Sequence, residues 1–178
     1  MSTGRLGANL ADEQMAPCRM ASEDVPGPGE AKRGGSWKGD AVDLGWLRSL
    51  YDAHNSAGED FPDVLARDYL HTDAEFVEFA AAPGGRTHSG RDAIAALFRE
   101  RFEAGAMRIE ELELTAIDER TALAAFRIHM RGSGSGAETS MPLWNLITGD
   151  GARIVRVEEF SDEDAALAAA GRGGEPAV

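Results

Sequence analysis

The order of the hydrophobic patterns along the chain predicts an α+β fold. Apolar residues recur at helical spacing in two segments before residue 71 and in a third segment after residue 89. Strand-like patterns follow in four consecutive segments between residues 107 and 160, joined by three short turns, of which the last two contain glycine. Helices grouped first and an antiparallel meander afterwards indicate α+β and not alternating α/β. A strongly bent sheet wrapped around the N-terminal helices would enclose one pocket.

The composition limits the partners before any motif is considered. The 178 residues include 18 Lys or Arg and 31 Asp or Glu, a formal net charge of −13 at pH 7. Such acidity argues against nucleic acid and anionic membrane surfaces as partners, because phosphates repel it. A single cysteine, Cys18, excludes an internal disulfide framework. No apolar run approaches the length of roughly 20 residues that a membrane-spanning helix needs. The sequence also shows no signal-peptide pattern, so we expect a cytoplasmic protein.

Residues 1–40 differ from the rest of the chain. They contain seven Gly, three Pro and a single aromatic residue, Trp37, without helical or strand periodicity. Such a segment cannot bury enough surface to offset its ordering entropy, so we predict a disordered tail. This tail could be a linker, a regulatory arm or an overlong start-site assignment. Residues 41–172 are expected to form the folded domain, and residues 173–178 to fray.

The first helix is predicted to begin after Asp43 and to end at Gly58. Its apolar side repeats at helical spacing through Leu44, Leu47, Tyr51 and His54. A second, short helix would follow, capped by Asp60 and with Pro62 in its first turn, where the missing N–H costs little. The inward side of this second helix would be formed by Leu65, Tyr69 and Leu70.

One strand and a third helix come next. The segment Glu75–Phe79 is typical of a strand whose two faces are both partly covered, and Pro83–Gly85 ends it. Ser89 and Asp92 have the spacing of a capping box, so the third helix should start there and stop at Gly105. Its apolar stripe consists of Ile94, Leu97, Phe98 and Phe102.

The remaining strands are predicted at residues 107–117, 121–131, 137–148 and 152–160. Irregular apolar spacing in the first of them indicates a bulge. The Gly132–Gly136 run could be a linker, but its place between two strand patterns favours a hairpin turn. Ser161 would cap a last short helix that ends at Gly171.

Several strings, in this order, resemble the SnoaL-like polyketide cyclase branch of the ketosteroid isomerase and nuclear transport factor two superfamily. They are Ser89–Ile94, the Arg131–Glu138 turn and Asp150–Phe160, and the resemblance covers about residues 43–170. It implies a cone-shaped, cystatin-like α+β barrel with a deep apolar pocket, usually paired through its sheet as a homodimer. Arg127, His129 and Arg131 would lie on the outer face of one strand, where they could meet acidic partners across a two-fold axis or simply be solvated.

Strand parity places Val157 and Glu159 on one face of the last strand. The resemblance implies that Glu159 stands where the cyclases carry an Asp that removes a proton next to a carbonyl. A carboxylate facing an apolar pocket would be desolvated, which makes it a more effective base. The alternative is a solvated charge at the strand end.

In the cyclases, a His on the preceding strand faces the catalytic Asp. The corresponding residue of this chain is Trp144 or Asn145, depending on where in the hairpin its one extra residue relative to the cyclases is placed. Trp144 would form an aromatic wall, and Asn145 would orient a substrate carbonyl if a bulge turned it inward. The Tyr51–Gly58 string resembles the first helix of ketosteroid isomerases, which implies that Tyr51 donates a hydrogen bond to a developing enolate oxygen. Steroid isomerase chemistry itself is not expected, because Phe79 stands at the base position and Trp144 at that of the second acid.

His54 lies one turn after Tyr51 and could relay a proton with Glu159, or be a structural core histidine. The wall of the pocket is predicted to include Phe79, Phe126, Ile128, Met130 and Val157, together with Trp144 and Asn145. No His or carboxylate spacing indicates a metal site, and no phosphate-binding loop or other cofactor motif is present. We therefore expect neither metal nor cofactor.

Two functions remain open from the sequence. One is a cofactor-independent cyclase or isomerase that enolises a small, mostly apolar, polyketide-like carbonyl compound by general-base catalysis. The other is a non-catalytic small-molecule-binding module or a dimeric interaction module of the same fold. Cavity size separates them: an enzyme becomes implausible if side chains leave no pocket above roughly 300 Å³.

Overall fold

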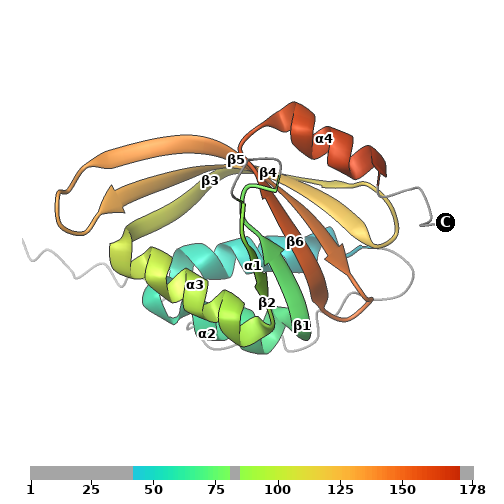
Figure 1. The fold of residues 1–178 in the computed structure, drawn as a ribbon, viewed down its shortest axis with the longest axis horizontal. Coiled ribbons are helices and arrows are strands. Elements are labelled where there is room, and N and C mark those ends of the chain that lie inside the picture. Colours follow the sequence, from blue (N-terminus) through green and yellow to red (C-terminus); the bar gives the residue numbers. More distant parts are fainter. Residues whose placement is uncertain (1–41, 81–84, 173–178) are drawn as a thin grey trace, which may run out of the picture. The chain divides into compact units, whose positions relative to one another are not determined.

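The structure, a computed structural model, describes residues 42–80 and 85–172 (Figure 1). The disorder predicted for residues 1–40 and the fraying predicted for residues 173–178 lie outside the described residues. So does most of the predicted strand break at Pro83–Gly85. These expectations stay predictions.

The α+β prediction is confirmed, with four α-helices and six strands in the described part of the chain. Their bounds are α1 Leu44–Ala57, η1 Gly58–Asp60, α2 Phe61–Val64, η2 Leu65–Tyr69, β1 Leu70–Val77, β2 Thr87–Ser89, α3 Arg91–Ala104, β3 Gly105–Ala116, β4 Thr121–Gly132, β5 Glu138–Gly149, β6 Ile154–Phe160 and α4 Glu163–Arg172. The last four strands agree with the predicted segments to within two residues.

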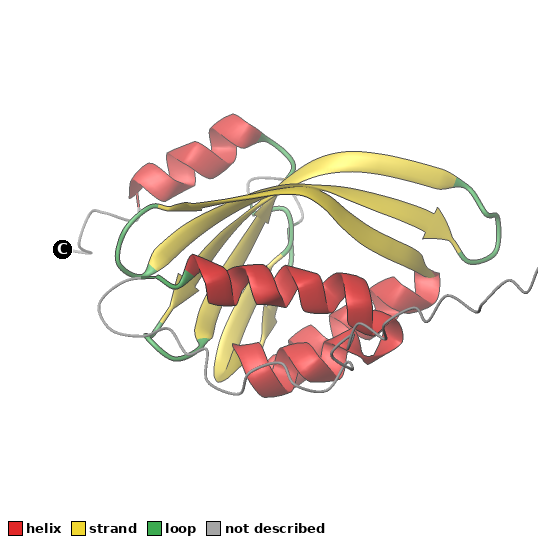
Figure 2. Ribbon diagram, turned by 180° about the vertical axis from the view of Figure 1, so that it is seen from behind, coloured by secondary structure: helices red, strands yellow, loops and turns green. Residues whose placement is uncertain are grey.

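The strands form a single sheet in the order β2-β1-β6-β5-β4-β3. It is curved and open, because β2 and β3 form its two edges. Helices α1, α2 and α3 lie on one side of it and α4 lies on the other (Figures 1 and 2). An antiparallel sheet was predicted, but one pair of neighbouring strands, β1 and β6, runs parallel.

The predicted start of the first strand was wrong. A single π-helical turn, η2, ends at Tyr69, and the chain becomes extended at Leu70. Leu70 aligns with Ile154 on β6, a partner remote in sequence, so local periodicity could not reveal this start. The strand also ends earlier than predicted, because Phe79 has a positive φ of 46° and sits in a turn. The three-residue β2, too short to show periodicity, was not predicted.

Several predicted helix caps differ in the structure. Asp43 caps α1, its Oδ1 accepting from the backbone N–H of Trp46 at 3.0 Å. The first helix ends at Gly58 as predicted, with a φ of 53° that favours glycine. By contrast, neither Asp60 nor the residue before α3 makes a side-chain cap, and Ser89 belongs to β2. Helix α4 extends one residue past Gly171.

The last helix is anchored by Asp162 instead of the predicted Ser161. The Asp162 Oδ1 accepts from the N–H of Ala165 at 2.8 Å. An aspartate at this position also places negative charge at the positive end of the helix dipole. The neighbouring Ser161 is exposed.

The predicted bulge in β3 is confirmed. Its register with β4 shifts between Glu110 and Glu113, and Glu111 adopts a φ of 55°. Just before the bulge, Asn55 of α1 holds both backbone groups of Ile109: Nδ2 donates to the carbonyl at 2.7 Å, and Oδ1 accepts from the N–H at 2.8 Å. These two bonds fix α1 against the sheet.

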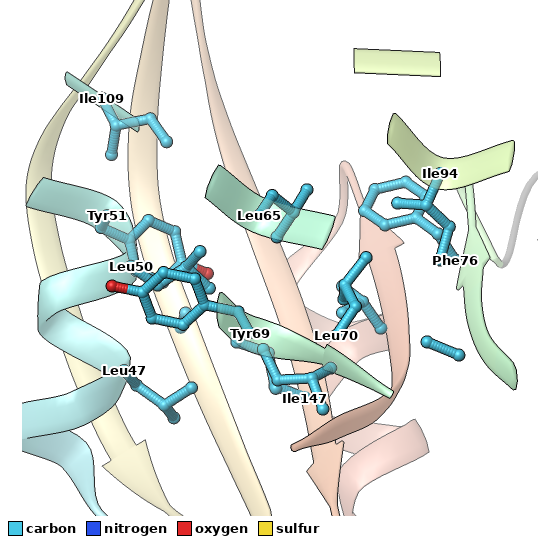
Figure 3. Packing of buried hydrophobic residues seen from close by; sticks show 14 of the residues in the cluster. Leu47, Leu50, Tyr51, Leu65, Tyr69, Leu70, Phe76, Ile94, Ile109 and Ile147 are labelled. Atoms are coloured by element: carbon cyan, nitrogen blue, oxygen red, sulfur yellow. The ribbon is translucent and has the colours of Figure 1, made fainter. Parts of the chain in front are cut away.

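The sheet has a hydrophobic core on each face. The larger one fills the space between the sheet and α1–α3, and Figure 3 shows part of it around Leu50, Tyr51 and Leu65. The smaller one lies under α4 and includes Leu146 and Phe160. The functional site described next lies on the face of the larger core.

Within the described ranges, no helix is long and apolar enough to cross a membrane.

Candidate functional site

Two cavities meet on the helix-covered face of the sheet. The inner one has a volume of about 70 Å³ and a mostly apolar lining. Its polar lining residues are Tyr51, His54, Arg101, Asn145 and Glu159. The outer one, of about 270 Å³, shares five lining residues with the inner one, of which Arg101 and Glu159 are the charged ones. The two residues therefore stand at the border between both spaces.

Most of the residues predicted from the sequence are brought together here. The inner cavity is lined by Tyr51, His54, Phe126, Ile128, Asn145, Val157 and Glu159. The outer cavity is lined by Phe79 and Met130, together with Ile128 and Glu159. Met107 and Met141 join Met130 there, so flexible apolar side chains form much of the outer wall.

Trp144 does not line either cavity, which corrects the predicted aromatic wall. It packs on the opposite face of the sheet, against the smaller core under α4. The reason is the register of β5 with β6: Asn145 stands opposite Glu159, and Trp144 stands opposite Phe160. Neighbouring residues of a strand point to opposite faces, so Asn145 enters the cavity and Trp144 cannot.

Glu159 is buried, with only 4% of its side chain exposed, so the alternative of a solvated strand-end charge is wrong. It is not a bare carboxylate in an apolar pocket either. Arg101 donates to both of its oxygens, Nη1 to Oε2 and Nη2 to Oε1, each at 3.1 Å. This two-pronged geometry is the strong form of an arginine–carboxylate pair.

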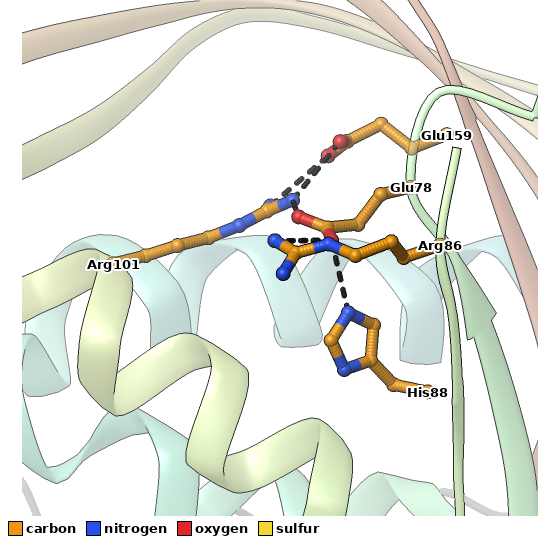
Figure 4. A network of polar contacts seen from close by, with 5 residues as sticks. All are labelled: Glu78, Arg86, His88, Arg101 and Glu159. Atoms are coloured by element: carbon orange, nitrogen blue, oxygen red, sulfur yellow. Dashed lines mark hydrogen bonds and ion pairs between the residues drawn. The ribbon is translucent and has the colours of Figure 1, made fainter. Parts of the chain in front are cut away.

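Arg101 also donates from Nη2 to a second carboxylate, Oε1 of Glu78, at 2.9 Å. The other oxygen of Glu78 contacts His88 Nε2 at 2.9 Å and Arg86 Nη2 at 3.2 Å. Figure 4 shows Arg101 reaching from α3 toward the two carboxylates, with His88 and Arg86 on the far side of Glu78. Burial alone would raise the pKa of Glu78, but the bonds from His88 and Arg101 outweigh it and lower that pKa.

Arg101 was not identified from the sequence, although a signal existed. It lies three residues after Phe98 and seven after Ile94, on the predicted apolar stripe of its helix. Its guanidinium packs over the rings of Phe76 and Phe98, with its central carbon 5.3 and 5.4 Å from the two ring centroids. Burial by itself would lower the pKa of Arg101, but Glu159 and Glu78 outweigh it and raise that pKa, so the side chain stays charged.

Tyr51 is a buried hydrogen-bonding group facing the same cavity. Asn145 Nδ2 donates to its hydroxyl oxygen at 3.3 Å. The ring packs against Phe126, with the centroids 5.4 Å apart. Burial raises the pKa of Tyr51, while the bond from Asn145 opposes this rise and nearby Glu159 adds to it. The hydroxyl is therefore a neutral donor at any ordinary pH.

His54 is held in an aromatic environment, with Phe61 and Phe102 at centroid distances of 4.8 and 5.3 Å. Its Nδ1 lies 3.4 Å from Oδ1 of Asn55. Burial lowers the pKa of His54, and nearby Arg101 lowers it further, against the opposing effect of Asn55. His54 is thus a neutral imidazole at pH 7, and its bond to Asn55 favours the structural interpretation over a relay with Glu159.

Over residues 42–80 and 85–172, no group of three or more His, Cys, Asp or Glu side chains could hold a metal ion. The chemistry available at the cavity border is that of a buried carboxylate, a guanidinium, a phenol and an amide. Such a set can move a proton and stabilise an oxygen on which negative charge develops.

The fold and this site place the chain in the class of curved-sheet α+β proteins with an interior pocket. A SnoaL-like domain model matches residues 47–157, which is more than half of the chain. The chain therefore belongs to the SnoaL-like domain family. No curated protein matches the sequence.

Solved structures show the same fold at low identity. A candidate polyketide cyclase from Xanthomonas campestris pv. campestris is 18% identical, with a TM-score of 0.57 over 71% of this chain and 95% of that one. An NTF2-like protein from Burkholderia xenovorans LB400 is 18% identical, with a TM-score of 0.52 over 71% and 94%. TerC, co-crystallised with polyporic acid, is 17% identical, with a TM-score of 0.53 over 72% and 97%.

Proposed function

We propose that this protein is a cofactor-independent enzyme that enolises a small, mostly apolar carbonyl compound, with Glu159 as the general base. One observation supports this above all: a buried carboxylate, Glu159, and a buried neutral donor, Tyr51, line the same apolar cavity. Enolisation needs both, one group to accept the α-proton and one to stabilise the enolate oxygen.

In the proposed reaction, Glu159 takes a proton from the carbon next to the substrate carbonyl. The electron pair of that C–H bond forms the new C=C bond, and the carbonyl π electrons move to oxygen. Tyr51 donates its hydrogen bond to this oxygen, strengthened by the bond it receives from Asn145. The enolate then takes the proton back at another carbon, which is an isomerisation, or attacks an electrophilic carbon of the same molecule, which is a cyclisation.

Arg101 has a positioning role in this scheme. It fixes the Glu159 carboxylate through two bonds, leaving the remaining lone pairs of the carboxylate to face the substrate. When Glu159 takes up the proton and becomes neutral, Arg101 keeps its bond to Glu78 and so is not left as an unpaired buried charge. Its donors also lie at the cavity where the enolate charge forms.

Cavity size bears on the substrate. Neither space beside Glu159 reaches the roughly 300 Å³ that is usual for ligand pockets, since their volumes are about 70 and 270 Å³. By the criterion set from the sequence, each space taken alone counts against an enzyme and favours the binding module, so an enzyme requires a substrate that occupies both spaces. We therefore propose a small substrate, whose reacting group enters the inner cavity while the rest occupies the methionine-lined outer one.

The test is hydrogen–deuterium exchange at the carbon next to the carbonyl of butan-2-one, followed by NMR in D₂O. Exchange should be faster with the protein than without it, and Glu159→Gln should abolish that gain while retaining the fold. The matched control is Glu158→Gln, because Glu158 is the neighbouring carboxylate on β6, bonds Arg156 and lines neither cavity. Unchanged exchange in Glu159→Gln would exclude this residue as the base.

A second candidate is a small-molecule-binding module without turnover. The observation that favours it is the engagement of both Glu159 oxygens by Arg101. One structural neighbour, TerC, was co-crystallised with a small molecule, polyporic acid. Binding of butan-2-one without any exchange would favour this module over the enzyme.

We also propose a homodimer paired through the sheet, in the cytoplasm. On the outer face, Arg127 of β4 lies 3.2 Å from Glu111, Arg131 of β4 lies 3.9 Å from Glu138, and His129 lies 3.3 Å from Glu110, so cations and carboxylates stand side by side there. Such a pattern is self-complementary across a two-fold axis. Sedimentation that shows a monomer at micromolar concentration would refute the dimer.

A further inference from the structure

Asn145 presents an unpaired acceptor inside the protein. Its Nδ2 donates to Tyr51, and its Oδ1 is buried without a hydrogen-bond partner among the described residues. The residue lines the inner cavity, directly opposite Glu159 in the sheet register. A buried acceptor without a partner is costly, and in folded proteins such an atom is normally satisfied. A ligand in this cavity would satisfy it by carrying a donor.

Tyr51 complements this acceptor with a donor. Because its hydroxyl oxygen already accepts the N–H of Asn145, its own hydrogen is available to a ligand. Two hydrogen-bonded residues of the cavity lining therefore carry one available donor, on Tyr51, and one unpaired acceptor, on Asn145. A ligand that matches both carries a hydrogen-bond acceptor and a hydrogen-bond donor on neighbouring atoms.

We propose that the substrate is a small hydroxyketone, with a hydroxyl group on a carbon next to the carbonyl carbon. Its carbonyl oxygen accepts from Tyr51, and its hydroxyl donates to Oδ1 of Asn145. This inference rests on the proposed enolisation and names the substrate class for it. Asn145 is then the residue that determines specificity, while Glu159 carries out the proton transfer.

Other ligand classes fit less well. A carboxylate offers no donor to Asn145 and would face the negative charge of Glu159. A plain ketone leaves the Asn145 oxygen unpaired. A primary amide could bond both groups, but its α-hydrogen is much less acidic than that of a ketone, so the proposed reaction disfavours it.

The dimensions agree with a small head group. The inner cavity, of about 70 Å³, offers several times the roughly 10–15 Å³ of such space that one water molecule needs. It can therefore take the two oxygens and the carbons that carry them. A longer apolar substituent would extend past Arg101 into the outer cavity, between Met107 and Met130.

The experiment compares two probes that differ by one hydroxyl group, 3-hydroxybutan-2-one and butan-2-one. Their dissociation constants are measured by NMR titration with the full chain and with Glu159→Gln, in which neither probe is expected to react. The hydroxyketone should bind at least about tenfold more tightly than butan-2-one. A difference of this size is expected because butan-2-one leaves the buried oxygen of Asn145 without a hydrogen bond. In Asn145→Leu this ratio should fall to about one.

Tyr51→Phe is the matched control. It removes the donor for the carbonyl group that both probes share, so both should bind more weakly while their ratio is retained. If Asn145→Leu does not fold, Asn145→Val removes the same acceptor with a side chain suited to a strand. Equal affinity for the two probes, or a preference that survives the loss of the Asn145 oxygen, would overturn the inference.

The two proposals can fail separately in these experiments. If butan-2-one exchanges its α-hydrogens but 3-hydroxybutan-2-one is not preferred, the inference fails and the enolisation stands. If the hydroxyketone is preferred but no exchange occurs, the enolisation fails and the recognition site stands.

Discussion

Replacing Arg101 by methionine should strongly destabilise the fold, because Glu159 would lose its cation. The Glu159 side chain is 4% exposed and that of Arg101 is 21% exposed, so water can compensate little. For unit charges 3.1 Å apart and an effective dielectric constant of about 20, the Coulomb energy is about 5 kcal/mol. Breaking a buried pair from one side typically costs about 3–5 kcal/mol. We expect Arg101→Met to lower the free energy of unfolding by that amount.

Urea unfolding followed by circular dichroism measures this loss. With a slope of about 2 kcal/mol per molar urea, the midpoint should fall by about 2 M. The matched control is Arg99→Met on the same helix, whose partner Asp63 is 71% exposed. A surface pair of this kind contributes about 0–1 kcal/mol, so that variant should stay near the wild type.

A double-mutant cycle separates the pair from its surroundings. Arg101→Met combined with Glu159→Leu removes both charges, so it should cost much less than the sum of the single changes. The same cycle with Glu78→Leu should show weaker coupling, because Glu78 also has Arg86 and His88 as partners. Additive losses at Arg101 and Glu159, or a loss no larger than that of Arg99→Met, would refute the reasoning.

Three further changes test other parts of the structure. Asn55→Ala removes both bonds to the backbone of Ile109 and should cost about 2 kcal/mol, with faster hydrogen exchange at the Ile109 amide; unchanged exchange would contradict the anchoring of α1. Burial lowers the pKa of His54 from 6.5, so the unfolded state takes up a proton first and stability falls as the pH drops below about 6.5. His54→Leu should reduce the loss of unfolding free energy between pH 7 and about 5.5, and an equally steep loss would show that other groups cause it. Trp144→Ala should lower the free energy of unfolding by about 2 kcal/mol by loosening α4, and it should leave the affinity for butan-2-one unchanged. Weaker binding of this probe would show that Trp144 lines the pocket after all.

The four strands of the meander could be predicted closely because their signal is local. Strand β4 shows alternation of apolar and polar residues, β3 shows it on either side of its bulge, and short turns separate the four strands, with glycine in the last two turns. The start of β1 could not be predicted in the same way. Its residues Leu70 and Glu75 align with Ile154 and Arg156 of β6 in a parallel pairing, and no turn signal connects partners so far apart in sequence.

The candidate site, like the fold, could be predicted where the signal is local and not where it depends on how strands pair. Parity predicted that Glu159 points inward, since the direction of a strand residue follows from its neighbours. Between Trp144 and Asn145 the sequence left a choice, because parity on β5 depends on its register with β6. That register places Asn145 opposite Glu159, and with it the acceptor to which the proposed specificity is assigned.

By itself, the sequence determined the α+β class, the family resemblance and an inward carboxylate on the last strand. All three follow from periodicity and short strings, which depend on residues close together in the chain. Only the tertiary structure decided what surrounds that carboxylate. Arg101 lies 58 residues from Glu159 and 23 from Glu78 in sequence, and folding alone brings the three together. The physical reason is that a buried charge is stable only with partners, and those partners come from a helix and a turn that no local pattern links to the last strand.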